Sequence, residues 1–272
     1  MREKNFLSQN GFPVAKFRHV TTKESLLKAI DEIGYPSILK TAGFGYDGKG
    51  QSRIKSSDDL TNIIEKLGEK EFVLEKLINF DTEFSVVCAR DSQGNFVHYG
   101  LIENIHTNHI LDISISHFKP NVKVQKEAVE ITRGIADKFG FIGTMCVEFF
   151  LLPNDELIVN EIAPRPHNSG HLTFDTSCIT SQFEQQLHAI CSLPLGSAEF
   201  LKPVAMANLL GDIWQEKIPD WSNLLTMKNV KLHLYGKQEA RIDRKMGHIT
   251  AIADSAETAK KLVSEAREGL LS

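Results

Sequence analysis

The chain has 272 residues and a nearly balanced charge, with 31 basic against 35 acidic side chains and a net charge of −4. This balance argues against partners that a basic surface attracts, so we expect no nucleic-acid partner and no membrane partner. The four cysteines form no C-x-x-C pair, and no apolar run reaches the roughly 18 residues needed to span a bilayer. We therefore expect a cytoplasmic globular protein with reduced thiols.

The predicted elements mix helices and strands without a regular alternation. The N-terminal third predicts helices at 3–10, 21–33 and 58–67 and strands at 14–20, 37–40, 51–55 and 71–78. Within it, Thr21 and Glu24 match a capping box, and Gly34 is typical of a helix end. The remainder predicts antiparallel hairpins at 83–106 and 143–165, helices at 124–139 and 181–193, strands at 204–209, 230–235 and 248–253, and a closing helix from 255. This order indicates an α+β fold with mostly antiparallel strands.

A glycine-rich loop, KTAGFGYDGKGQ at 40–51, follows one predicted strand and runs into another. It matches the dinucleotide pattern G-x-G-x-x-G and also the P-loop, except that Gly50 stands where a magnesium-binding Ser or Thr belongs. Both motifs require a helix directly after the loop, so the dinucleotide interpretation is excluded. Two interpretations remain: a flexible surface hairpin, or a flap whose backbone N–H groups hold phosphates. Lys40 and Lys49 favour the flap.

The second predicted hairpin places two carboxylates on neighbouring strands. A two-residue turn pairs Leu152 with Leu157, and this register puts Glu148 opposite Glu161. Like charges directly opposite each other are destabilising, and burial makes them costlier. A shared Mg²⁺ that also binds nucleotide phosphates would compensate. The alternatives are a register shifted by one residue, or a glutamate that pairs with Arg165.

The run APRPHNSGH follows this hairpin. Arg165 and His167, held between prolines, suit the stabilisation of an anionic intermediate beside a metal. His167 and His171 are four residues apart, but the composition is that of a loop, so the spacing does not indicate a helical zinc site. Near the C-terminus, a basic cluster is either a solvated face or a phosphate site, and it comprises Arg241, Arg244, Lys245 and His248.

Several runs resemble those of one family, in the same order: GYDGKGQ, EKLINFDTEFS, ENIH, NEIAPRPHNSGH, SQFEQQLHAI and RKMGH. Lysines beside a glycine flap, a paired-glutamate hairpin and a trailing arginine resemble the ATP-grasp superfamily. Within it, these runs resemble the 5-(carboxyamino)imidazole ribonucleotide synthases of purine biosynthesis. Biotin carboxylases carry E-x-N-x-R after the second metal-binding glutamate, whereas this chain has Ala163 at the asparagine position.

The resemblance implies an ATP- and bicarbonate-dependent carbon–nitrogen ligase. ATP would phosphorylate bicarbonate to carboxyphosphate, which delivers CO₂ to the exocyclic amine of 5-aminoimidazole ribonucleotide. A flap that closes over the site would keep carboxyphosphate from water. The implied cofactors are ATP and Mg²⁺, the implied partners are these small-molecule substrates, and the implied assembly is a homodimer.

The resemblance also implies a role for each matching residue. The ATP phosphates would contact Lys40, Gly45, Tyr46, Asp47, Gly48, Lys49, Gly50 and Gln51, and the adenine would lie against Glu75, Lys76, Leu77 and Ile78 through main-chain contacts. Glu83 would bind the ribose, His106 and Asn160 would belong to the nucleotide site, and Glu148 and Glu161 would bind Mg²⁺. The implied catalytic residues are Arg165, His167, Asp47 and Lys245, and the implied substrate-binding residues are Tyr46, Arg241, Arg244 and Lys245.

The implied architecture is an ATP-grasp fold of two α+β lobes, at 1–76 and 77–198, followed by a small β-rich subdomain at 199–272. The family also begins with a Rossmann-like domain of roughly 100 residues, which this sequence lacks. We therefore expect ATP affinity to survive in part and aminoimidazole ribonucleotide affinity to be weaker. Two alternatives remain: a shortened, non-catalytic nucleotide-binding module, and a biotin carboxylase-like ATP-grasp ligase with another acceptor.

Overall fold

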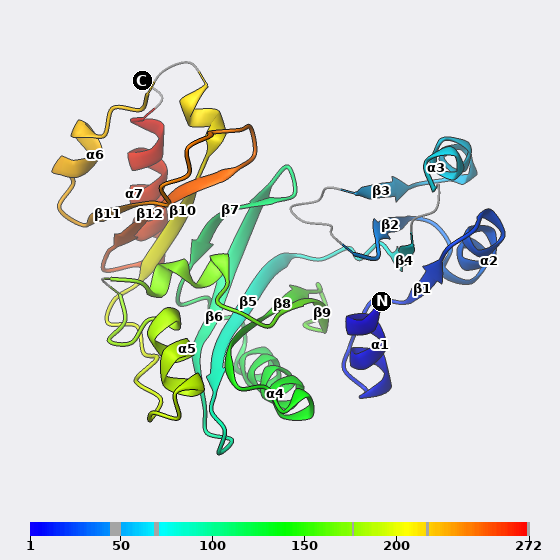
Figure 1. The fold of residues 1–272 in the computed structure, drawn as a ribbon, viewed down its shortest axis with the longest axis horizontal. Helices are drawn as coiled ribbons and strands as arrows, with labels where there is room; N and C mark the ends of the chain where they lie inside the picture. Colours follow the sequence, from blue (N-terminus) through cyan, green and yellow to red (C-terminus); the bar gives the residue numbers. More distant parts are fainter. Residues whose placement is uncertain (44–49, 68–70, 176, 216–217, 271–272) are drawn as a thin grey trace. The chain divides into compact units, whose positions relative to one another are not determined.

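A computed structural model of the chain describes residues 1–43, 50–67, 71–175, 177–215 and 218–270 (Figure 1). By contacts the chain divides into two compact units. Unit 1 comprises Met1–Asp81 and Phe150–Glu161, and unit 2 comprises Thr82–Phe149 and Ile162–Ser272. Within the described ranges, no helix is both long and apolar enough to cross a membrane. The three-part division at 76 and 198 stays a prediction.

Unit 1 contains a four-stranded antiparallel sheet with the strand order β1-β4-β2-β3. Its N-terminal segment consists of α1 (Arg2–Gln9), β1 (Phe17–Val20), α2 (Lys23–Ile33), β2 (Ser37–Thr41), β3 (Gln51–Ile54), η1 (Ser57–Asp59), α3 (Leu60–Leu67) and β4 (Phe72–Lys76). Leu26, Ile30 and Ile33 of α2 are buried against Leu39 and Leu74 of the sheet, the spacing of one helix face. The capping box of α2 uses Thr22 and Ser25 rather than the predicted Thr21 and Glu24.

The strand–loop–strand context of the glycine loop is confirmed. β2 and β3 pair antiparallel, with Lys40 opposite Gln51. Next to this pair, the Thr41 N–H donates to Gly50 O at 3.0 Å. Gly50 has φ of +82°, and a Cβ there would lie 2.8 Å from Thr41 Oγ1, so the position requires glycine. The loop residues Gly45, Tyr46, Asp47, Gly48 and Lys49 lie outside the described residues.

Unit 2 is built on an eight-stranded sheet with the order β11-β12-β10-β7-β6-β5-β8-β9. The strands of this sheet are β5 (Thr82–Arg90), β6 (Phe96–Thr107), β7 (Ile110–Ile115), β8 (Gly143–Leu151), β9 (Leu157–Ala163), β10 (Val204–Leu210), β11 (Val230–Leu234) and β12 (Lys245–Ile252). The end of β8 and most of β9 are counted with unit 1. The helices of unit 2 are α4 (Val122–Phe139), η2 (Asn168–Thr173), α5 (Gln182–Ile190), η3 (Gly211–Trp214), α6 (Ser222–Thr226) and α7 (Ala256–Glu268). The sequence analysis predicted both hairpins and three of these α-helices but missed β7 and η2.

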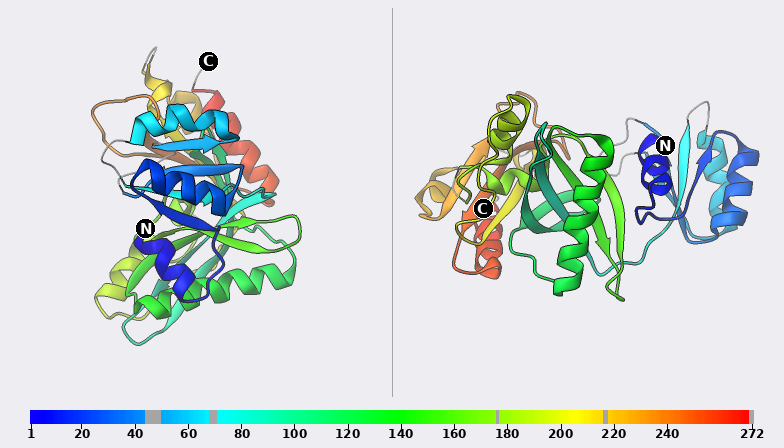
Figure 2. Two further views of the ribbon diagram at one scale, coloured as in Figure 1. Left: turned by 90° about the vertical axis from the view of Figure 1, so that its right-hand side faces the viewer. Right: turned by 90° about the horizontal axis from the view of Figure 1, so that it is seen from below.

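The alternation of side chains along β10 separates two apolar layers. Ala205 and Ala207 lie in one cluster with Val263 of α7, which covers this face of β10 and β12 (Figure 1). Met206, between them, belongs to a second cluster with Leu172 of η2 on the opposite face. Farther along the sheet, α4 packs against β5 and β6 (Figure 2). The second face, beneath η2, is the one that carries the polar residues described below.

The predicted two-residue turn between β8 and β9 is wrong. The Leu152 N–H donates to Glu156 O at 2.9 Å, and the Asp155 N–H donates to Leu152 O at 3.0 Å. Asp155 has φ of 64°, in the left-handed region, so the loop holds three residues. The pairing beside the turn is therefore shifted by one residue, as the alternative interpretation had it. The predicted register that placed Glu148 directly opposite Glu161 depended on the shorter turn, and the observed turn does not support it.

Candidate active site

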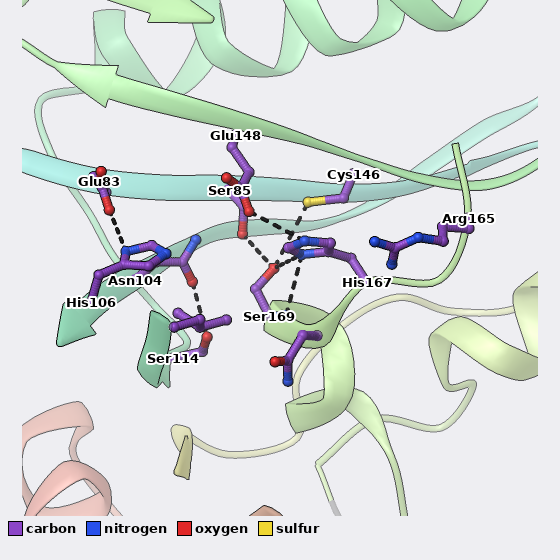
Figure 3. A network of polar contacts seen from close by, with 12 residues as sticks. Glu83, Ser85, Asn104, His106, Ser114, Cys146, Glu148, Arg165, His167 and Ser169 are labelled. Atoms are coloured by element: carbon purple, nitrogen blue, oxygen red, sulfur yellow. Dashed lines mark hydrogen bonds and ion pairs between the residues drawn. The ribbon is translucent and has the colours of Figure 1, made fainter. Parts of the chain in front are cut away.

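Strand alternation gathers polar side chains on one face of the unit 2 sheet (Figure 3). Glu83 of β5 pairs in register with Asn104 of β6, which pairs with Ser114 of β7, and paired residues share a face. The Ser114 hydroxyl donates to Asn104 Oδ1 at 2.9 Å. Ser85 lies two residues after Glu83 and therefore on the same face. This row of buried hydroxyl and amide groups forms the floor of the candidate site.

His167 lies over this floor and is held from both sides of its ring (Figure 3). Its Nε2 lies 3.2 Å from Glu148 Oε1, and its Nδ1 lies 2.8 Å from Ser169 Oγ. The Ser169 N–H also donates to Nδ1, at 3.3 Å, in the N-terminal cap of η2. A backbone N–H can only donate, so Nδ1 accepts and Nε2 carries the proton. His167 therefore donates its Nε2–H to Glu148.

Burial, followed by the positive charges of Arg165 and Lys245, lowers the pKa of His167 to about 3. The imidazole is thus neutral at pH 7, in agreement with its hydrogen bonds. Arg165 is exposed, and its Nη1 donates to Pro166 O at 2.9 Å. His167 Nε2 is a hydrogen-bond partner of Glu148. The site combines a neutral imidazole with nearby cations.

A bulge in β6 directs His106 toward Glu83. The register of β6 with β7 shifts between Ile105 and His106, and His106 Nδ1 pairs with Glu83 Oε2 (Figure 3). Burial alone would lower the pKa of His106, but the hydrogen bond and charge of Glu83, with the charge of Glu148, outweigh burial and raise it. The sequence analysis assigned both residues to a nucleotide site, and the structure joins them.

A column of stacked histidines, which the sequence pattern does not predict, lies beside His167. His171 stacks on His248 at 5.0 Å between ring centroids, and His248 stacks on His233 at 4.5 Å. His248 and His233 are register partners on β12 and β11, whereas His171 comes from η2. Tyr235 Oη lies 2.9 Å from His248 Nδ1, and Asp175 Oδ2 lies 3.0 Å from His233 Nε2. Sequence spacing alone does not reveal this column, because its members meet only after the strands pair.

Burial, then the neighbouring positive charges, lowers the pKa of His171 to about 4, and burial, then the neighbouring histidines, lowers that of His248 to about 2. No described residue pairs with the buried His248 Nε2. The unfolded chain therefore binds a proton at this residue near pH 6.5, whereas the folded protein does not. Stability from a neutral His248 is present above pH 6.5 and is lost progressively as the pH falls from 6.5 toward 2.

We expect His248→Phe to flatten this acid sensitivity. The slope of the free energy of unfolding between pH 6.5 and 4 should fall by about 1.4 kcal/mol per pH unit relative to the parent protein, because one titrating group is removed. Urea unfolding at half-unit pH steps measures both slopes. Parallel curves for the two proteins would contradict the assignment of this slope to His248.

In unit 1, two lysines converge on one buried carboxylate. Glu75 Oε2 lies 3.1 Å from Lys40 Nζ and 3.4 Å from Lys4 Nζ, and Lys4 also donates to Asn160 O at 2.9 Å. Burial lowers the pKa of Lys4, and the charge of Glu75 opposes that effect. Lys4 was missed by the sequence analysis, although a lysine beside Leu7 on the buried face of α1 is a signal. Lys40 and Glu75, both predicted site residues, are thereby brought together.

The segment after Glu75 carries some of its own hydrogen bonds. The Lys76 N–H donates to Lys16 O at 2.8 Å, and the Leu77 N–H donates to Pro36 O at 3.2 Å. In this conformation, the predicted main-chain contacts with an adenine must use other groups of 75–78. The C-terminal basic cluster is also partly engaged: Arg241 Nε donates to Glu239 Oε2 at 2.8 Å, and Arg244 Nη1 donates to Glu239 O at 2.9 Å. Glu239 thus organises this cluster.

The described candidate residues are divided between the units. Unit 1 contains Lys40, Gly50, Gln51, Glu75, Lys76, Leu77, Ile78, Asn160 and Glu161, and unit 2 contains Glu83, His106, Glu148, Arg165, His167, Arg241, Arg244 and Lys245. Within the described ranges, no three acidic, histidine or cysteine side chains form a group that could hold a metal by themselves. Mg²⁺ takes one or two protein carboxylates and completes its shell with phosphates and water, so its binding by Glu148 and Glu161 stays a prediction.

Comparison with known proteins identifies two matching family models. The ATP-grasp domain matches residues 5–183, and the phosphoribosylaminoimidazole carboxylase C-terminal domain matches residues 204–262. The N5-carboxyaminoimidazole ribonucleotide synthase of Bacillus subtilis is 42% identical, over 91% of this chain and 64% of its own length. The corresponding synthase of Brucella melitensis is 40% identical, over 92% of this chain and 68% of its own length.

Solved structures give the same similarity. An ADP complex of an N5-carboxyaminoimidazole ribonucleotide synthetase has a TM-score of 0.89 at 41% identity, over 97% of this chain and 69% of that chain. An Aspergillus clavatus N5-carboxyaminoimidazole synthase in complex with ADP and 5-aminoimidazole ribonucleotide has a TM-score of 0.87 at 30% identity. The match covers 98% of this chain and 71% of that chain. The chain spans 64% of the length of the Bacillus subtilis relative and 69% of the ADP complex.

Proposed function

Because the chain belongs to the ATP-grasp superfamily and, within it, to the N5-carboxyaminoimidazole ribonucleotide synthase family, we propose that it carboxylates 5-aminoimidazole ribonucleotide. ATP transfers its terminal phosphoryl group to bicarbonate, giving ADP and carboxyphosphate. Cleavage of the carboxyphosphate C–O bond releases phosphate and CO₂, and the exocyclic amine forms the new C–N bond and loses a proton. The pairing of a neutral His167 with Glu148, near Arg165, is the observation that carries this proposal.

His167 and Arg165 would stabilise bicarbonate and carboxyphosphate. Both intermediates are anions, so a guanidinium charge and a nearby Lys245 favour them. An imidazole that is neutral at pH 7 can turn its Nε2–H from Glu148 to an anionic oxygen without first gaining a proton. Burial of His167 supports this role because hydrogen bonds to anions are stronger away from water.

The family resemblance suggests nucleotide-binding residues in each unit. Lys40, oriented by Glu75, and the glycine flap would take the phosphates, and the His106–Glu83 pair would take the ribose. Glu148 and Glu161 would hold Mg²⁺, which neutralises phosphate charge when bound. Tyr46, Asp47, Arg241, Arg244 and Lys245 would contact the ribonucleotide. The net positive charge of the last three suits its phosphate.

ADP release measured in a coupled assay tests this function. We expect release that requires both bicarbonate and 5-aminoimidazole ribonucleotide. No release with any acceptor would support a non-catalytic nucleotide-binding module, and release with another acceptor would support a biotin carboxylase-like ligase. Either result would overturn the proposal. The family resemblance also supports a homodimer in the cytoplasm, and light scattering that gives a monomer mass would contradict the dimer.

A further inference from the structure

Gln182, the first residue of α5, holds the backbone of His167 from both sides. The His167 N–H donates to Gln182 Oε1 at 2.9 Å, and Gln182 Nε2 donates to His167 O at 2.8 Å. Gln182 is fully buried. Its own main chain is fixed as well, because its N–H donates to Thr173 Oγ1 at 3.0 Å and its carbonyl accepts from Thr144 Oγ1 at 3.0 Å.

This amide clamp determines where the His167 ring lies. The N–H and C=O of a residue fix its φ and ψ, and these fix the direction of its Cβ. The ring must then meet Glu148 on one nitrogen and Ser169 on the other. Gln182 Nε2 also lies 3.1 Å from Nδ1 of His171, the next histidine of the loop. One buried amide therefore sets both the backbone of His167 and the position of its neighbour.

Gly170 provides the space for the clamp. A Cβ at Gly170 would lie 2.4 Å from Gln182 Oε1, which is too close for any side chain. Because this oxygen is hydrogen-bonded and buried, it cannot move aside without breaking its bond to the His167 N–H. The glycine of the NSGH run is thus explained by Gln182, since its φ is not in the left-handed region.

We propose that Gln182 is a positioning residue for His167, and that the alignment of the His167 imidazole for carboxyphosphate depends on this clamp. The proposal rests on the proposed function for the identity of the reaction. Misplacement of a reacting group by about 1 Å costs on the order of 100-fold in rate. Loss of the clamp should therefore affect the rate of turnover far more than the affinity for ATP.

The chain contains a matched control one turn along α5. Gln185 is also fully buried, and it clamps the backbone of Gly196 in the same way. Gln185 Nε2 donates to Gly196 O at 2.7 Å, and the Gly196 N–H donates to Gln185 Oε1 at 3.1 Å. Methionine is close to glutamine in shape and lacks both polar groups. Each substitution hence removes an equivalent pair of hydrogen bonds from a side-chain amide to a backbone. The pair lost in Gln182→Met is to His167, and the pair lost in Gln185→Met is to Gly196.

The experiment compares these two variants of the full chain. We expect both to lower Tm by similar amounts. Gln182→Met should lose about 100-fold in kcat with little change in the KM for ATP, whereas Gln185→Met should keep the parent kcat within about twofold. In ¹⁵N-histidine spectra, the ring signals that vanish in His167→Asn should shift in Gln182→Met and not in Gln185→Met. Equal kcat losses, or unshifted His167 signals, would overturn the proposal.

Gly170→Ala reaches the clamp from the other side and leaves Gln182 in place. It should reproduce the shifted His167 signals and the lowered kcat, and it decides the matter if Gln182→Met does not fold. The proposed function and the positioning role of Gln182 can be tested separately. A parent protein that releases no ADP would defeat the proposed function, while the His167 spectra would still test whether Gln182 positions the ring.

Discussion

Glu161→Gln should lower ADP release by at least about 100-fold and leave the free energy of unfolding within about 0.5 kcal/mol of the parent value. Glutamine keeps the shape of the side chain but removes the charge that a hard cation requires. Glu161 is exposed, so the fold does not depend on its carboxylate. ADP release at saturating Mg²⁺ and urea unfolding measure the two quantities independently.

Glu148→Gln should lose turnover to a similar degree but should also lose stability. Glu148 accepts the Nε2–H of the buried His167, and a glutamine amide satisfies that bond less strongly. We expect a cost of about 1–2 kcal/mol. The two variants should differ in stability because Glu148 accepts a hydrogen bond from the buried His167, whereas Glu161 is exposed.

Glu156→Gln is the matched control for both. Glu156 lies in the same hairpin, beside the turn, and is exposed. Its main chain contributes to the turn, since its carbonyl accepts from the Leu152 N–H and its N–H donates to Asn154 Oδ1, and the substitution keeps both groups. Turnover and stability should both match the parent. If Glu161→Gln also matched the parent in turnover, the assignment of Glu161 to Mg²⁺ would be wrong.

The elements that the sequence predicted best are those with local signals. The flap hairpin follows from two β-like runs around glycines, and β5 and β6 follow from their alternation. The family resemblance rests on contiguous runs, and the fold is confirmed by the solved structures of the family. β7, Ile110–Ile115, was missed although ILDISI alternates and is longer than some of the strands that were predicted.

The errors arose where one residue changes the geometry or where distant segments meet. A left-handed Asp155 adds one residue to the β8–β9 turn and shifts the predicted register, and aspartate adopts this conformation only in some contexts. The clamp of Gln182 on His167 and the stacking of His171 on His248 join segments that no pattern links. The family and the types of its reactive side chains were therefore predictable from the sequence, whereas the residues that orient those side chains were not.

Glu75→Gln should destabilise the protein by about 3 kcal/mol or more, much the largest effect on the fold that we expect. Glu75 is 5% exposed and is shared by Lys4 and Lys40. Removal of the carboxylate takes away the counter-charge that Lys4 and Lys40 share, and Glu3 remains as a weaker influence on Lys4. Breaking a buried ion pair by loss of one partner costs about 3–5 kcal/mol. Urea unfolding at pH 7 measures the loss.

Lys4→Met is the matched comparison and should cost less than about 1.5 kcal/mol. The substitution replaces a buried ammonium with an apolar side chain of similar length, and Glu75 keeps Lys40 as its partner. The two variants should differ in stability because of the net charge of these three side chains. Loss of Lys4 leaves Lys40 and Glu75, whose charges cancel, whereas loss of Glu75 leaves two positive charges side by side. In the parent protein, Lys4, Lys40 and Glu75 together carry one net positive charge, which favours a phosphate.

The pH dependence of Glu75→Gln provides a second check of this reasoning. Burial already lowers the pKa of Lys4, and loss of Glu75 removes the largest influence that raises it. The folded variant then releases this proton at a lower pH than the unfolded chain, so its stability rises with pH in that window. The deficit relative to the parent should hence shrink between pH 7 and pH 10. A deficit that stays constant, or a Lys4→Met variant as unstable as Glu75→Gln, would show that packing rather than charge balance holds these three side chains together.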